Sequence, residues 1–414
     1  MMRKFLKVPS IPIQLMVAVV LAIAGAVAFG PLPALDYSMK QVGGIFMDAL
    51  KMLVVPLAFV SITAATVQMG AERLRRLSSR FLLLMTAMCL IGFALGYVLM
   101  SLMPIAPFEI DDAAVKAVSA PSALEFIRNC IPVNPFQSLA SGNMLQIIVL
   151  SFFIGLACLK LDEKERIVHG FETAQQICIR IANMVMHLAP LGVFCLLYPV
   201  VARNLSGVVL AYVQMTAMLL VGLALYMAFC SLPLLFLFKV DKPFAYFKTI
   251  ILGDVVGAIA GGSMTYMAPR IANLKKHTAL NPDVIDFFIP ITAVLTRMGS
   301  CICVGIYTVF AASIFHITLS WEQLIVCAFL TIIALMCAPG IIGGTLMDCA
   351  IIWSAIGIPI EAIAYIAGID YIIDVIRTVL NIQGGEIITA CMNRSSLNLQ
   401  FSYKNEVQKY EQDI

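Results

Sequence analysis

Long apolar runs separated by short polar gaps dominate this chain. Windows of about 20 apolar residues match a hydrocarbon thickness of about 30 Å at 1.5 Å per helical residue. Two longer apolar regions follow at 243–313 and 320–391, and neither is a plain series of spans. The pattern predicts an all-α polytopic membrane protein. The shorter windows lie near residues 11–29, 44–66, 81–103, 131–159, 173–200 and 206–238.

Small residues, Gly and Pro interrupt both long regions at corresponding places. The first interruption is AIAGGSMTYMAP (258–269) and the second is CAPGIIGGTLMD (337–348). Each precedes a long helix, predicted near 282–313 and 361–391. Paired interruptions in two halves of a chain indicate inverted repeats with re-entrant segments, whose backbone lines a cavity or is buried in protein. Kinked ordinary helices are the alternative.

Composition supports a bilayer as the solvent. Hydrophobic residues make up 61% of the chain and charged residues 12%, against about 45–50% and about 25% in soluble domains. The net charge is 27 − 24 = +3, which excludes a strongly basic nucleic-acid binder and an acidic disordered chain. The cysteines stand mostly alone in apolar runs and are expected to be buried free thiols.

Cationic residues gather in alternate polar gaps. Such gaps favour the cytoplasm, so both termini are predicted to be cytoplasmic, in a cell inner membrane. The run from Ile11 to Phe29 is expected to be a first membrane helix rather than a cleavable signal. The cationic positions are Arg3, Lys4, Lys7, Arg73, Arg75, Arg76, Arg80, Lys160, Lys164, Arg166, Lys239, Lys242, Arg394, Lys404 and Lys409.

A polar stripe crosses the last apolar segment. Asp370, Asp374, Arg377, Thr378 and Asn381 lie at i, i+4, i+7, i+8 and i+11, so they share one helix face. An ionised side chain at the centre of a membrane helix costs about 2.5–3.5 kcal/mol. The stripe is therefore expected to face a cavity and bind a ligand. A salt bridge that only ties helices together is the alternative.

The chemistry of the stripe suits an amino acid with an acidic side chain. Arg377 can bind a carboxylate bidentately, and Asp374 can bind an ammonium group. Thr378 and Asn381 can hydrogen-bond the α-carboxylate. A dicarboxylate without an amine would leave Asp374 unpaired beside a second anion, which is costly.

These motifs resemble those of the glutamate transporter family, the dicarboxylate/amino acid:cation symporters, over nearly the whole chain. The segments KMLVVPLAF (51–59), NPFQSLASGNMLQIIV (134–149) and APLGVF (189–194) are similar to the family's second, fourth and fifth helices. The stripe itself is the strongest match, and Pro269 and Pro290 fall where the family has prolines.

The resemblance implies eight transmembrane helices, two re-entrant helical hairpins and a homotrimer that works as an elevator. It implies a static scaffold of 1–75 and 106–205. It also implies a moving transport domain of 76–105 and 206–395, with a cytoplasmic tail at 396–414.

The resemblance also implies roles for residues. Asp374 would bind the substrate amine and Arg377 its side-chain carboxylate, with Thr378 and Asn381 completing the site. The second hairpin would be the extracellular gate. Hairpin one and helix seven would add Ser263, Met264, Thr265 and Ser300, and the gate would contain Gly340, Gly343 and Gly344.

Departures from the family pattern concern its sodium sites. Thr296 and Met298 stand where the family has a sodium-binding Asn and Asp, and Gly385 replaces an Asp of the last helix. Hard cations need oxygen ligands, so sodium coupling is predicted to be lost or reduced. Arg297, placed mid-helix, is interpreted as a built-in cation. The alternative is that Arg297 points to lipid headgroups or scaffold.

Three intramembrane acids, Asp348, Asp370 and Glu386, are candidate proton carriers. For Asp348 and Glu386 the alternative is a place at a membrane interface. The chain shows no nucleophile–base pair, metal cluster or cofactor motif, so an enzyme is not expected.

The expected function is secondary transport of aspartate or glutamate. One rival is a C4-dicarboxylate facilitator, exchanger or proton symporter. Another is a binding-only receptor or an anion channel.

Overall fold

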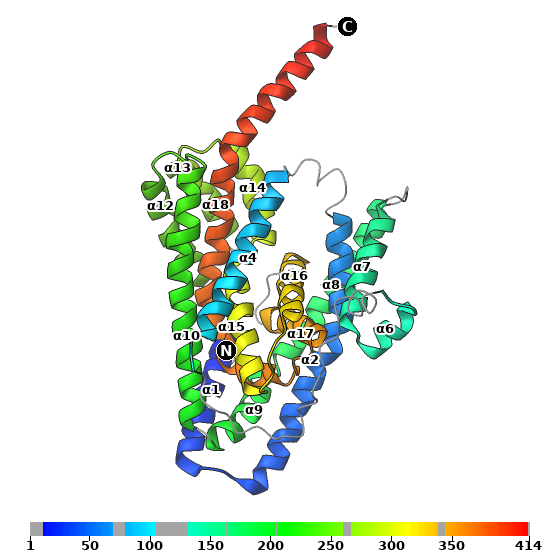
Figure 1. The fold of residues 1–414 in the computed structure, drawn as a ribbon, viewed down its shortest axis with the longest axis vertical. Helices are drawn as coiled ribbons and strands as arrows, with labels where there is room; N and C mark the ends of the chain where they lie inside the picture. The colour runs from blue at the N-terminus through cyan, green and yellow to red at the C-terminus, as the bar shows by residue number, and fades with distance from the viewer. Residues whose placement is uncertain are drawn as a thin grey trace, which may run out of the picture.

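The computed structural model describes residues 11–68, 79–104, 131–159, 161, 164–203, 205–259, 266–337 and 344–412. Every regular element within these ranges is a helix (Figure 1). The prediction of an all-α protein is confirmed. The first and third apolar windows correspond to α1 (Ile11–Phe29) and α4 (Ser79–Ser101).

One group of helices is built around α2 (Pro33–Gln68). This helix packs against α7 (Met144–Cys158), α8 (Lys164–Met186) and α9 (Ala189–Arg203), and α9 packs along α1. The window predicted at 173–200 is divided between α8 and α9, because Pro190 has no N–H to donate to the preceding turn.

A short helix, α6 (Pro135–Ser141), breaks the window predicted at 131–159. The side chain of Asn134 caps its start, and Gly142 ends it in the left-handed conformation with φ of 70°. Asn143 then caps α7 by accepting a hydrogen bond from the Gln146 N–H. Asparagine caps and a left-handed glycine are the expected local signals for ending one helix and starting another.

A second group contains α4, α10 (Leu205–Tyr226) and α15 (Met298–Ile314). A π-helical turn, η2 (Met227–Ser231), joins α10 to α11 (Leu232–Leu237). Glycines let the backbones of α4 and α15 meet. A Cβ on Gly96 would overlap the Ile302 carbonyl, and one on Gly305 would overlap the Phe93 carbonyl.

Gly305→Ala is expected to destabilise the protein by about 1–3 kcal/mol, because backbone atoms cannot move aside as a flexible side chain can. Thermal unfolding in detergent measures the loss. Gly44→Ala in α2 is the matched control, since its new methyl group meets nothing within 4 Å and alanine favours a helix. Equal melting temperatures for the two variants would contradict this close packing.

Both predicted interruptions lie between paired helices. The first pair is α12 (Pro243–Ile259) and α13 (Met267–His277), and the second is α16 (Trp321–Cys337) and α17 (Gly344–Ile356). Within each pair the helices contact one another. The two tips, 260–265 and 338–343, lie outside the described residues.

The helix predicted near 282–313 is not continuous. It is broken between α14 (Pro282–Leu295) and α15, where Arg297 has φ of −139° and ψ of 46°. A continuous helix would send the Ser300 N–H to the Thr296 carbonyl. That N–H instead donates to the side-chain oxygen of Asn381 at 3.2 Å. The position expected for Arg297, inside a helix, is therefore wrong.

The last helix, α18 (Ala362–Gln412), crosses the molecule and projects beyond it (Figure 1). It packs against α12, α14 and α15, and its stripe residues Asp370 and Asn381 hydrogen-bond Tyr307 and Ser300 of α15. It also extends helically through most of the tail predicted at 396–414.

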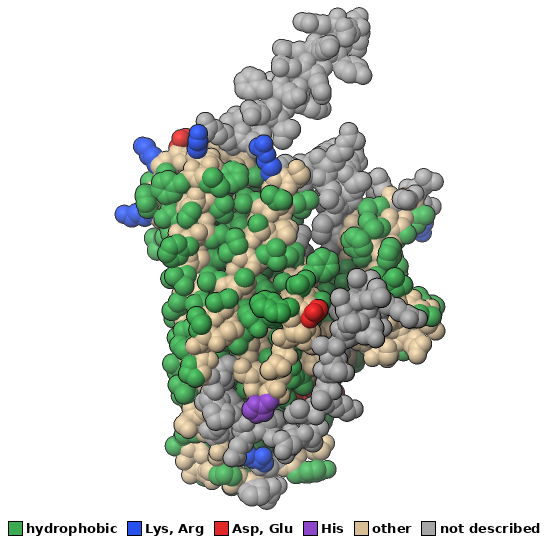
Figure 2. Space-filling view, in the orientation of Figure 1, with side chains coloured by type: hydrophobic (Ala, Val, Ile, Leu, Met, Phe, Trp, Pro, Cys, Tyr) green, Lys and Arg blue, Asp and Glu red, His purple; other side chains and the backbone are tan. Residues whose placement is uncertain are grey.

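The described residues form three helical stretches that are long and apolar enough to cross a membrane: Ser79–Ser101, Leu205–Leu237 and Pro282–Ile314. Large apolar side chains cover the face seen in Figure 2, and Lys and Arg gather near the end where α12 and α13 lie. Exposed residues such as Leu83 and Phe229 are suited to contact with lipid. The protein is therefore a multi-pass membrane protein.

Candidate substrate-binding site

Arg377 is the centre of the stripe on α18. It is 1% exposed, its Nη1 donates to Asp370 Oδ1 at 2.7 Å, and its Nη2 donates to Asp374 Oδ1 at 2.5 Å. The i, i+3 and i, i+7 spacing on one helix brings the three groups together. One guanidinium therefore faces two carboxylates.

The two carboxylates differ in their surroundings. Asp370 is buried and also accepts a hydrogen bond from the Tyr307 hydroxyl of α15 at 2.8 Å. The Asp374 side chain is 19% exposed, and its only hydrogen bond among the described residues is the one from Arg377. Asp374 is thus the acid that is free to change partners.

The Nε of Arg377 is buried and has no acceptor among the described residues. A buried donor left unpaired costs about 1–3 kcal/mol, and guanidinium nitrogens form a fork that matches a carboxylate. The unpaired Nε of Arg377 and the partly exposed carboxylate of Asp374 together suit an anionic ligand that carries an amine.

Asn381 connects α18 to the break before α15. Its Oδ1 accepts from the Ser300 N–H and its Nδ2 donates to Ser300 Oγ, both at 3.2 Å. The Thr296 hydroxyl lies within hydrogen-bonding distance of the Asn381 and Thr292 carbonyls. The structure therefore brings Asn381 and Ser300 together as predicted, while Thr378 is half-buried one residue beyond Arg377.

Arg297 is buried and paired. Its Nη1 donates to Asp348 Oδ2 at 3.2 Å, and its Nη2 lies 3.5 Å from Thr345 Oγ1, both on α17. Arg297 is 6% exposed and Asp348 is 1% exposed. The alternatives of lipid headgroups for Arg297 and a membrane interface for Asp348 are therefore wrong. The charge of Arg297 is also already balanced by an acid of the protein.

Several predicted site residues lie outside the described part of the chain. These are Ser263, Met264 and Thr265 in hairpin one and Gly340 and Gly343 in hairpin two. Gly344 is described: it begins α17 and is buried.

Sequence reasoning missed a second buried cluster, formed by Asp254 of α12, Arg270 of α13 and Glu386 of α18. Arg270 Nε donates to Glu386 Oε1 at 3.1 Å, and its Nη2 donates to the Ile382 carbonyl at 2.9 Å. All three side chains are at most 2% exposed, so Glu386 is not at an interface. The sequence feature that could have revealed this cluster is the single Asp of α12, Asp254, and the single Arg of α13, Arg270, on either side of the first interruption.

Residues 14–395 of this chain match the family model described as the sodium:dicarboxylate symporter family. A proton/sodium-glutamate symport protein of Bacillus subtilis (strain 168) is 25% identical over 92% of this chain and 91% of its own length.

Two other relatives have the same identity to this chain, and their names give different substrates. A proton/glutamate-aspartate symporter of Escherichia coli (strain K12) is 25% identical over 84% of this chain and 83% of its own length. A C4-dicarboxylate transport protein of Anaeromyxobacter sp. (strain K) is 25% identical over 93% and 89%.

Proposed function

Because the chain belongs to the sodium:dicarboxylate symporter family, whose members are transporters and not enzymes, we propose that it is a secondary transporter of aspartate or glutamate. The observation that carries this proposal is the unpaired, buried Nε of Arg377 beside the partly exposed Asp374. An anion with an amine supplies partners to both groups, whereas an anion alone does not.

Substrate binding on this geometry is an exchange of ionic partners. The substrate ammonium takes Asp374, which releases Nη2 of Arg377. The substrate side-chain carboxylate then accepts from Nη2 and Nε, which are two donors of the same planar fork. Asp370 keeps Arg377 oriented through Nη1. In this proposal Asn381 and Thr378 hydrogen-bond the α-carboxylate.

We further propose the elevator arrangement implied by the family resemblance. The group around α2 is the scaffold that forms homotrimer contacts, and α4 and the elements from α10 to α18 form the moving domain. The hairpin of α16 and α17 is the gate. Both termini lie in the cytoplasm of a cell whose inner membrane holds the protein, because the cationic gaps favour that side.

Sodium coupling is proposed to be lost or reduced. Met298 and Gly385 lack the carboxylates of the family's sodium sites, and a monovalent hard cation is bound through oxygen ligands. Arg297 supplies a permanent positive charge beside the stripe, and Asp348 holds it in place. A permanent charge can support substrate binding but carries no energy from a gradient.

A C4-dicarboxylate is the second candidate substrate, and the named relative from Anaeromyxobacter supports it. Asp374 favours the amino acid, since a dicarboxylate would leave this acid unpaired next to a second anion. Competition of labelled aspartate uptake by succinate or malate distinguishes the two substrates.

Asp374→Asn is expected to weaken aspartate binding by at least about tenfold and succinate binding much less, because the charged partner is lost only for the amine. Isothermal titration with both ligands measures the difference. Asp283→Asn at the exposed start of α14 is the control. Equal losses for aspartate and succinate would show that Asp374 does not bind the amine.

Uptake by proteoliposomes tests the proposed function directly. Labelled aspartate is offered while sodium, potassium and proton gradients are imposed one at a time. Exchange of labelled for unlabelled aspartate supports a transporter. Binding without exchange supports a receptor, and anion current without substrate flux supports a channel.

A further inference from the structure

The cluster of Asp254, Arg270 and Glu386 lies just beyond the end of the substrate stripe, since Arg270 Nη2 donates to the carbonyl of Ile382, the residue after Asn381. Glu386 lies nine residues after Arg377 on α18, which is about 14 Å along a helix at 1.5 Å per residue. Its partners come from both arms of hairpin one, α12 and α13. The substrate chemistry described above makes no use of these three side chains.

The cluster contains one more acid than base. Arg270 satisfies Oε1 of Glu386, while Oε2 of Glu386 and both oxygens of Asp254 have no hydrogen-bond donor among the described residues. Asp254 is 0% exposed. An ionised carboxylate buried without donors is among the costliest groups in a protein interior. The geometry therefore calls for one more positive charge or one proton.

Asp254 and Glu386 are neighbours within the buried cluster, and Arg270 leaves three of their four carboxyl oxygens without a donor among the described residues. Two ionised carboxylates are both acceptors, so neither can donate to the other unless one of them carries a proton. The other titratable neighbours are Arg270, the Tyr246 hydroxyl of α12, which donates to the Glu386 carbonyl at 2.9 Å, and Cys391 of α18.

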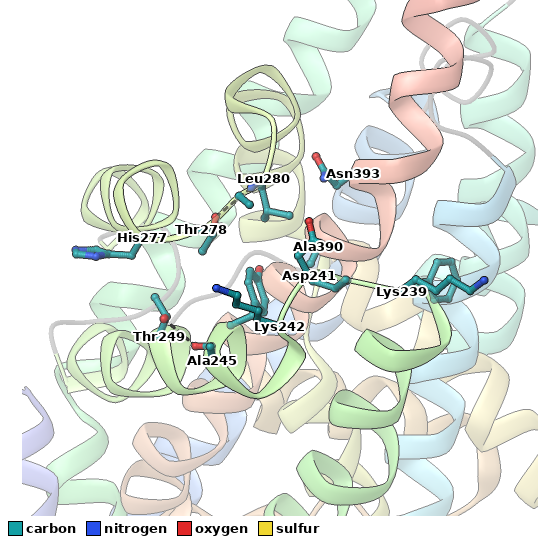
Figure 3. A pocket seen from close by; sticks show the side chains of 14 residues that line it. Lys239, Asp241, Lys242, Ala245, Thr249, His277, Thr278, Leu280, Ala390 and Asn393 are labelled. Atoms are coloured by element: carbon teal, nitrogen blue, oxygen red, sulfur yellow. Dashed lines mark hydrogen bonds between the residues drawn. The ribbon is translucent and has the colours of Figure 1, made fainter.

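A cavity of about 670 Å³ lies at the lysine-rich end of the molecule, between the end of α11, the start of α12, the end of α13 and α18 (Figure 3). Tyr246 lines the cavity and also contacts Glu386. Ala390, another lining residue, is one helical turn beyond Glu386. Lys239 and Lys242 stand at the rim, and the positive-inside rule assigns this end to the cytoplasm. Asp254 and Glu386 do not line the cavity themselves, and Tyr246 is the described residue that connects it to Glu386.

We propose that Asp254 and Glu386 share one transported proton, and that Arg270 is the positioning residue that keeps the second carboxylate ionised. This inference rests on the proposed transport function and names its coupling ion. The proton binds to the pair from the outside, accompanies the substrate, and leaves to water on the cytoplasmic side, which restores the second carboxylate.

The charge balance favours one proton for each substrate. Aspartate and glutamate each carry one net negative charge at neutral pH. One proton at the pair adds one positive charge, so the total charge of the moving domain is the same loaded and empty. Burying an extra charge in a membrane domain is costly, and the proton removes that cost.

The test uses the full chain in proteoliposomes with labelled aspartate. A gradient of about two pH units, acid outside, can concentrate a substrate about 100-fold when one proton accompanies each molecule. Asp254→Asn and Glu386→Gln place a permanently neutral amide where the proton would bind. Both variants are expected to lose gradient-driven accumulation by at least about tenfold and to retain aspartate exchange at equal pH.

Asp286→Asn is the matched control, because Asp286 is an exposed acid of α14 that pairs with Lys275. It should accumulate aspartate as the unmodified protein does. If either test variant fails to fold, the other variant decides. Proton uptake on aspartate binding to the unmodified protein, from titrations in buffers of different ionisation enthalpy, should be about one per aspartate.

Three outcomes would overturn the proton site. Full accumulation by both variants would do so, and so would aspartate binding without proton uptake. Accumulation driven by a sodium gradient at equal pH and lost in Asp254→Asn would assign the pair to a metal cation instead. Absence of aspartate exchange in the unmodified protein is a different result, because it overturns the transport function together with this inference.

Discussion

Arg377→Ala is expected to abolish binding of aspartate and glutamate. The change removes the fork that binds the substrate carboxylate, and it leaves Asp370 and Asp374 facing each other without a cation. Truncating one partner of a buried charge pair costs about 2–5 kcal/mol, which is about 30-fold to several thousand-fold in affinity. Isothermal titration with aspartate, on protein purified in detergent, measures the loss.

Arg377→Lys tests whether binding needs the planar guanidinium of Arg377 or only its positive charge. Lysine keeps one positive charge but lacks the planar fork, so this variant should fold as the unmodified protein does and still bind aspartate far more weakly. Arg377→Thr, which leaves space and a hydroxyl group, is expected to admit small neutral amino acids. Arg180→Ala on the exposed face of α8 is the control. Undiminished aspartate affinity in Arg377→Ala would end the proposed binding mode.

Substrate affinity in the unmodified protein is expected to be flat from zero to high sodium, with choline as the balancing salt. The charge of Arg297 is part of the protein and does not change with the sodium concentration, so it cannot make substrate binding depend on sodium. Arg297→Met should weaken aspartate binding by about 10–100-fold, because Asp348 then has no cationic partner while it lies near Asp370. Binding titrations at several sodium concentrations test both statements.

A double variant separates the loss of the Arg297–Asp348 pair from the effect of an unpaired Asp348. Arg297→Met with Asp348→Asn removes both members of the pair and leaves no unpaired buried acid. If the pair only holds α15 and α17 together, the double variant should bind as weakly as Arg297→Met alone. If the unpaired Asp348 causes the loss, affinity should recover. Steep sodium dependence of the unmodified protein would contradict the proposal for Arg297 at once.

Restoring a sodium site requires more than the two missing carboxylates. A Cβ added at Gly385 would lie 2.9 Å from Arg270 Nη2 and 2.8 Å from Thr292 Oγ1. An aspartate at 385 would therefore pair with Arg270 instead of a sodium ion. Sodium dependence is expected only when Arg270→Met and Glu386→Gln accompany Arg297→Met, Met298→Asp and Gly385→Asp.

The sequence by itself determined the features that depend on local spacing. Apolar windows identified α1 and α4 to within about two residues, and the Gly/Pro interruptions marked the segments that separate α12 from α13 and α16 from α17. Asp370, Asp374 and Arg377 were predicted to share a face because a helix repeats every 3.6 residues, whatever surrounds it. The resulting ion pairs lie within α18 and need no other element.

Tertiary structure decided what depends on groups distant in the chain. At the break before α15, Asn381, which is 81 residues from Ser300, accepts the Ser300 N–H that has no acceptor within the helix. Arg297 and Asp348 are 51 residues apart, and Arg270 and Glu386 are 116 apart. Hydropathy and the helical periodicity of polar residues describe one segment of the chain at a time. They can place a charge inside a membrane, but its partner and its missing hydrogen bonds are fixed only when the helices pack.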